Sequence, residues 1–134
     1  MEPPFAAGAG AAGSKTATYL CKGLPAARIA IGLSAFSAPG LFVRGLRLRE
    51  VEDPAAVFIT RMVGARDLLL GVGALAASRE ARRLWLALGL AADAADAAAA
   101  ALALRGGAPK PGMVISLVAA LGAVGLGAWA LADR

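Results

Sequence analysis

The 134-residue chain has no histidine and a single cysteine, Cys21. The lack of histidine removes the commonest metal ligand and the usual general base near neutral pH. One cysteine cannot form an internal disulfide, so the fold is not expected to depend on one. No Ser/His/Asp, Cys/His, P-loop or dinucleotide-binding pattern is present. We therefore predict neither a metal site nor a cofactor.

Charged residues are also scarce. They make up 17% of the chain, whereas apolar residues make up 59% and the mean hydropathy is +0.69. A soluble domain of this size must cover its core with polar side chains, so this balance argues against one. The 17 glycines agree, because glycine is more frequent in membrane helices than in soluble helices. The sequence predicts an integral membrane protein whose main partner is the lipid bilayer.

Aromatic residues are only 5% of the chain, although its net charge is +5. The basic residues flank apolar runs, where they would meet lipid headgroups, instead of forming a patch with aromatics between them. Nucleic acid is therefore not an expected partner. The start, Met1-Glu2-Pro3-Pro4, lacks the positive and apolar regions of a signal peptide. With no targeting segment apparent, we expect a multi-pass protein, by default in the plasma membrane.

Four apolar segments have about the length that a helix needs to cross roughly 30 Å of hydrocarbon. The predicted fold is all-α, a membrane-embedded bundle of about four transmembrane helices. Residues 1–23 are predicted to be a flexible N-terminal tail, and residues 24–134 a single transmembrane domain. The predicted spans are residues 24–43, 55–77, 84–104 and 113–131.

The first of these spans is interrupted by polar and helix-breaking residues. Arg28 lies near one end, where its aliphatic stem would let the guanidinium reach the headgroups. Pro39 is expected to end or kink the helix near the other end. Arginines alternate with leucines after it, and acidic residues follow. Residues 41–53 are therefore predicted to lie along the membrane surface.

Small residues suggest how the helices pack. In the second span, Gly64, Asp67 and Gly71 share one face. In the last span, Ala119, Ala123 and Gly127 recur every four residues. Such a stripe of small side chains allows the backbone of another helix to approach closely. We predict that both faces contact neighbouring helices.

Five ionisable residues lie inside the second and third spans. An aspartate or arginine at the centre of a membrane helix costs roughly 2.5–3.5 kcal/mol on insertion scales. Such residues usually face the protein interior and pair with one another. The candidate site is accordingly a buried cluster that either binds a ligand or serves as a structural set of ion pairs. Its members are Arg61, Arg66, Asp67, Asp93 and Asp96.

The hairpin geometry predicts the pairs in this cluster. Because the chain turns near residues 80 and 81, Arg66 is expected opposite residue 95. Asp93 and Asp96 are three residues apart and present two carboxylates on one helix face. A bidentate bridge from Arg66 to Asp96, or else to Asp93, is predicted. Asp67 is expected to meet a third helix, or Arg61 through a bend.

The element Arg61-Met-Val-Gly-Ala-Arg-Asp67, followed by Gly71 and by Asp93-x-x-Asp96, resembles a family of small four-helix membrane proteins of unknown function. The R-x-x-G-x-R-D element is the most specific part of a likeness that covers residues 25 to 131. A looser similarity is to small DoxX-like four-helix membrane proteins. The resemblance implies the fold and the location of the site but no activity.

Three functions agree with these features. The first is a small membrane-embedded binding or accessory protein whose cluster holds the polar group of a lipophilic small molecule. The second is a membrane enzyme, such as an isomerase or cyclase, that uses Asp93 or Asp96 as acid or base. The third is a proton- or ion-coupled transporter, which would work as a homo-oligomer because four short helices offer little lumen. The sequence leaves open whether the protein is an enzyme.

Overall fold

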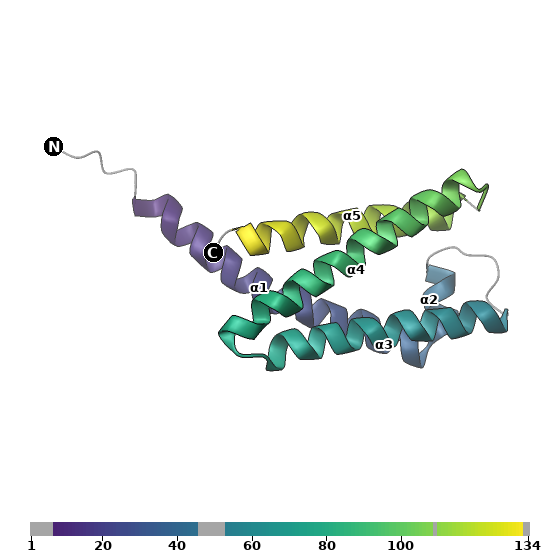
Figure 1. Ribbon diagram of the computed structural model, residues 1–134, viewed down its shortest axis with the longest axis horizontal. Helices are drawn as coiled ribbons and strands as arrows, with labels where there is room; N and C mark the ends of the chain where they lie inside the picture. The colour runs from purple at the N-terminus through teal and green to yellow at the C-terminus, as the bar shows by residue number, and fades with distance from the viewer. Residues whose placement is uncertain (1–6, 46–52, 109, 133–134) are drawn as a thin grey trace.

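The computed structural model describes the backbone of residues 7–45, 53–108 and 110–132, and the side chains of residues 22–45, 53–108 and 111–132. Within these ranges all regular structure is α-helical (Figure 1). The predicted all-α class is thus confirmed. The helices are α1 (Ala7–Ser37), α2 (Pro39–Gly45), α3 (Pro54–Ala76), α4 (Arg79–Arg105) and α5 (Lys110–Ala132).

Two of these helices, α4 and α5, are long and apolar enough to cross a membrane. The second half of α1 together with α2 makes a third, if the bent pair is counted as one span. Helix α3 has 23 residues, enough to cross, but it carries Arg61, Arg66 and Asp67 and is not among them. Length and composition therefore support two or three spans directly, not four.

The predicted first span, residues 24–43, is divided between two helices. Helix α1 ends at Ser37, and α2 leaves it at an angle of 114°. Pro39 begins α2, and since proline has no N–H, it cannot continue the hydrogen bonding of α1. The predicted surface segment 41–53 shares residues 41–45 with α2, while residues 46–52 lie outside the described part of the chain.

The N-terminal part of the chain differs from the prediction of a flexible tail. Residues 7–23 form the first turns of α1, and residues 1–6 lie outside the described part. The alanines of this segment favour a helix, whereas its glycines disfavour one, so the extension of α1 does not follow from helix propensity alone. Helices α3, α4 and α5 contain the predicted segments 55–77, 84–104 and 113–131, apart from residue 77.

Helices α1 and α3 run antiparallel and touch backbone to backbone. A Cβ atom added at Gly32 would lie 2.6 Å from the backbone nitrogen of Leu68. One added at Gly64 would lie 2.7 Å from the nitrogen of Phe36, and one at Gly71 would lie 2.6 Å from the carbonyl oxygen of Pro25. Only glycine fits at such distances. The face predicted from Gly64, Asp67 and Gly71 is therefore a packing face, and α1 is the helix that it contacts.

Helices α4 and α5 form the second antiparallel pair. Their connection contains Gly107, whose φ of 85° suits glycine and few other residues. A short turn joins α3 to α4, and the side chain of Ser78 there accepts a hydrogen bond from the backbone N–H of Ala81 at the start of α4. The ring of Trp85 packs over Gly73 across this turn, which holds α3 and α4 together at that end.

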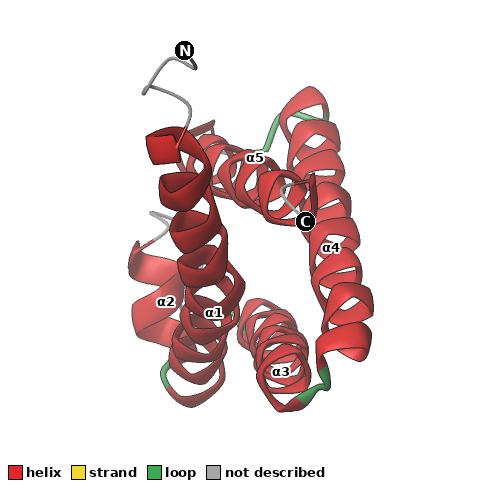
Figure 2. Ribbon diagram, turned by 90° about the vertical axis from the view of Figure 1, so that its left-hand side faces the viewer, coloured by secondary structure: helices red, strands yellow, loops and turns green. Residues whose placement is uncertain are grey.

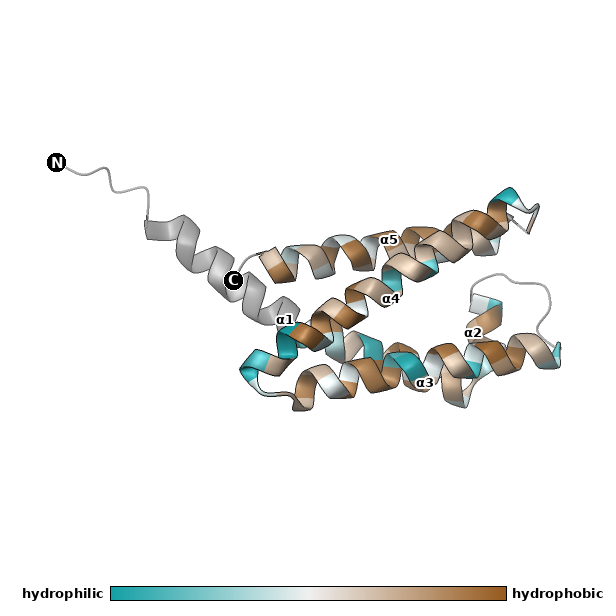
Figure 3. Cartoon of the chain, in the orientation of Figure 1, coloured by the Kyte–Doolittle hydropathy of each residue, from teal (hydrophilic) through white to brown (hydrophobic). Residues whose placement is uncertain are grey.

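The two pairs meet at the α3–α4 turn and diverge towards the other end of α4 (Figure 1). Viewed from the side, α1, α3, α4 and α5 stand around a common centre, with α2 beside α1 (Figure 2). Most residues of the helices are apolar, and hydrophilic bands interrupt α3 and α4 near their middles (Figure 3). The polar groups of those bands meet between the two pairs.

Candidate functional site

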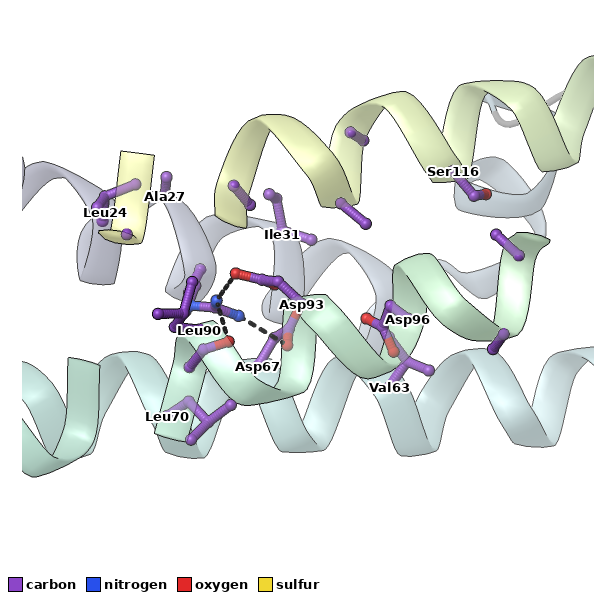
Figure 4. A pocket seen from close by; sticks show the side chains of 18 of the residues that line it. Leu24, Ala27, Ile31, Val63, Asp67, Leu70, Leu90, Asp93, Asp96 and Ser116 are labelled. Carbon is purple, nitrogen blue, oxygen red and sulfur yellow. Dashed lines mark hydrogen bonds and ion pairs between the residues drawn. The ribbon is translucent and has the colours of Figure 1, made fainter. Parts of the chain in front are cut away.

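A cavity of about 900 Å³ lies between the two helix pairs. Side chains from α1, α2, α3, α4 and α5 line it, and most of them are apolar, including Ile31, Leu70 and Leu90 (Figure 4). Thr60 and Ser116 add hydroxyl groups. The charged side chains on the wall are Arg28, Asp67, Asp93 and Asp96.

These charged residues and Arg66 form a linear ionic network in which the signs alternate. Its order is Asp93, Arg28, Asp67, Arg66, Asp96. Arg28 comes from α1, Arg66 and Asp67 from α3, and Asp93 and Asp96 from α4. The network thereby joins both helix pairs. With two arginines and three aspartates, it has a formal charge of −1 when every member is ionised.

Arg28 connects α1 to the other two helices of the network. Its Nη1 donates to Asp67 Oδ1 at 3.3 Å, and its Nη2 donates to Asp93 Oδ2 and, at 3.0 Å, to the carbonyl oxygen of Gly89 (Figure 4). The Arg28 side chain is only 17% exposed. A Cβ atom at Gly89 would approach the guanidinium to 3.2 Å, so glycine gives the arginine access to the backbone of α4.

Arg66 makes the bidentate bridge that the sequence predicts. Its Nη1 donates to Asp96 Oδ1 at 2.9 Å and its Nη2 to Asp96 Oδ2 at 2.7 Å. Nε and Nη2 of Arg66 also donate to Asp67 Oδ1, at 3.2 and 3.0 Å. Asp67 thus accepts from both arginines and stands at the centre of the network. Asp67 contacts a third helix, α1, and this is one of the two alternatives that the sequence predicted for it.

Arg61 is placed differently from the rest of the predicted cluster. It is exposed on α3, and the four ion pairs among the described residues all join members of the ionic network. Arg28, in contrast, was expected at the headgroups and turns inward instead. Four of the five predicted residues therefore come together, and Arg28 makes the contact with Asp67 that was one alternative for Arg61.

A signal in the sequence could have located Arg28. Gly32 lies one helical turn after it, on the same face, just as Gly64 lies three residues before Asp67. Antiparallel contact between Gly32 and Gly64 sets Arg28 level with Asp67. Matching glycines between the first two long apolar segments would have placed the arginine inside the bundle.

The small-residue stripe on α5 faces the cavity. Ala119, Ala123 and Gly127 all line it, and a Cβ atom added at Gly127 would lie 3.4 Å from Leu90 Cδ1 on α4. The stripe was predicted to contact a neighbouring helix. These side chains also leave space, because residues this small do not fill the volume between α5 and the other helices.

Comparisons with known proteins add nothing to this geometry, since no family model, no curated protein and no solved structure matches the chain.

Proposed function

We propose that this protein binds a lipophilic small molecule in the cavity between its two helix pairs. The observation that carries the proposal is the cavity itself, about 900 Å³ in volume and apolar except at the ionic network, Thr60 and Ser116. Binding sites for small molecules are concave, roughly 300–1,000 Å³ in volume and mostly apolar, with a few polar groups that fix the orientation of the ligand. The cavity has each of these properties.

The proposal includes four membrane crossings, made by α1 with α2, α3, α4 and α5. The charged residues of α3 make this helix costly to place in a membrane. Their contacts with other residues lower that cost. Arg66 and Asp67 are paired with charges from α1 and α4, as ionisable residues in membrane helices usually are. Arg61 is exposed about two turns from the start of α3, where its side chain can extend towards the headgroups.

The family resemblance remains part of the proposal. Its most specific element, Arg61-x-x-Gly64-x-Arg66-Asp67, supplies two members of the ionic network and the glycine at the contact with α1. The element thus contributes both to helix packing and to the wall of the cavity. This supports the interpretation that the chain is a small four-helix membrane protein of that kind.

Exposure within the network favours binding over a purely structural role. Ion pairs that only fasten helices together are expected to be enclosed by protein. Here the Asp96 side chain is 41% exposed and borders the cavity. The bidentate bridge from Arg66 also fixes the orientation of the Asp96 carboxyl group, which suits ligand recognition.

Filling the cavity is expected to abolish binding of an apolar probe. We expect dodecanol to raise the unfolding temperature of the purified wild-type protein in a nonionic detergent, because a ligand that binds only the folded state stabilises it. In Ala123→Phe a ring would project from the cavity wall, and the shift should be lost. The measurement is thermal unfolding with and without dodecanol.

Ala128→Phe is the matched control. Ala128 lies on the same helix, is exposed, and is not on the cavity wall, so this variant should retain the shift. Equal stabilisation of both phenylalanine variants by dodecanol would show that the probe acts elsewhere and would remove the basis of the proposal.

A further inference from the structure

We infer that the polar group of the ligand is a protonated amine, so that the cavity selects lipophilic cations over lipophilic alcohols and acids. The inference rests on the proposed function, because it names the ligand class of the same cavity. Three observations carry it: the balance of charge on the wall, the hydrogen-bonding capacity that the network leaves unused, and the position of Asp96.

The charge on the wall is predominantly negative. Asp67, Asp93 and Asp96 all reach the cavity, whereas Arg28 is the arginine among its lining residues. Arg66, the second cation of the network, is not part of the lining within the described residues. A ligand in the cavity therefore meets three carboxylates and one guanidinium. Arg66 offsets part of this charge from behind the wall, so the network carries a formal charge of −1, and in an apolar surrounding this net charge favours a positive group.

The hydrogen bonds in the network point the same way. Both hydrogens of Arg28 Nη2 are directed to protein oxygens, and Nη1 donates to Asp67. A carboxylate can accept about four hydrogen bonds. Within the described residues no donor reaches Asp93 Oδ1 or Asp67 Oδ2, and neither is a fully buried atom left without a partner. Most of the unused capacity therefore belongs to acceptors.

Asp96 is the carboxylate best placed to contact a ligand. It lies farther along α4 than the contacts of Arg28, towards the part of the cavity bordered by Val63 and Ser116 (Figure 4). Its side chain is the most exposed of the network, at 41%. Its two oxygens each accept one hydrogen bond from Arg66 and can accept more. An ammonium group there would form charge-assisted hydrogen bonds.

Matched twelve-carbon probes test the inference. Dodecylamine, which is protonated at pH 7, dodecanol and dodecanoate have the same chain and differ in the head group. We expect the purified protein in nonionic detergent to bind dodecylamine about tenfold more tightly than dodecanol, since a charge-assisted hydrogen bond is stronger than a neutral one. Dodecanoate should bind more weakly than either. Affinities are obtained from the dependence of the unfolding temperature on probe concentration.

Two variants locate the preference. Asp96→Asn removes the negative charge but keeps the shape of the side chain, and it should reduce the preference for the amine to within about threefold. Glu80→Gln makes the same change of charge on an exposed residue of α4 away from the cavity, and it should leave the preference unchanged. A preference that is equally strong in Asp96→Asn would overturn the assignment of the ammonium site.

The comparison on wild-type protein decides the inference without any variant. Tighter binding of dodecanol or dodecanoate than of dodecylamine would overturn the amine preference while leaving the proposed binding function intact. If none of the three probes binds, both proposals are wrong.

Discussion

Replacing Arg28 by glutamine is expected to lower the free energy of unfolding by about 3 kcal/mol. Among the described residues, Arg28 is the cation that contacts Asp93. It also provides one of the two guanidinium groups that bind Asp67. Removing one partner from a buried ion pair leaves the other charge without compensation, which is far more destabilising than the pair is stabilising. Titration of the folded protein with a denaturing detergent in mixed micelles measures the change.

The matched control for this variant is Arg61→Gln. Both substitutions remove an arginine from a helix, but Arg61 is exposed and lies outside the ionic network. Substitutions at such positions usually change the free energy of unfolding by no more than about 0.5 kcal/mol. Equal destabilisation by the two substitutions would mean that Arg28 is not buried against α3 and α4 as described.

Replacing Gly64 by alanine is expected to cost about 1–3 kcal/mol, although alanine is the better helix former. The added methyl would lie 2.7 Å from the backbone nitrogen of Phe36 and 2.8 Å from the carbonyl oxygen of Gly32. Both atoms belong to the backbone of α1 and cannot rotate away, so the two helices must separate. Separation would also move Arg28 relative to Asp67. Unfolding in mixed micelles again gives the free energy.

Gly122→Ala on α5 makes the same chemical change where a Cβ atom would meet nothing within 4 Å. This variant should be neutral, or more stable by up to about 1 kcal/mol, because alanine has the higher helix propensity. A Gly64→Ala protein as stable as Gly122→Ala would show that α1 and α3 do not make backbone contact.

The parts of the site that could be predicted from the sequence depend on contacts across one short turn. The bridge between Arg66 and Asp96 follows from the position of the α3–α4 turn, because antiparallel helices joined by a tight turn have little freedom in register. Helical periodicity alone gives the shared face of Gly64, Asp67 and Gly71. Local periodicity and chain reversal suffice for these features.

The parts that were not predicted depend on the approach of α1. Its register against α3 is set by backbone contacts at Gly32, Gly64 and Gly71, between segments far apart in sequence. Near the end of a predicted span, an arginine is compatible with both the headgroup region and the interior. The cavity is likewise invisible to sequence patterns, because the small residues of α5 that leave it open look the same as residues that pack closely.

The central claim is that the ionic network joins the two helix pairs beside the cavity, with Arg28 on α1 held by Asp93 on α4. A double-mutant cycle of Arg28→Gln and Asp93→Asn measures this contact most directly, from the unfolding free energies of the wild type, the two single variants and the double variant. The account predicts a coupling free energy above about 1 kcal/mol, because the second substitution removes the carboxylate that the first one leaves unpaired. Effects that add to within about 0.5 kcal/mol would contradict the account, since that is the behaviour of residues that do not touch.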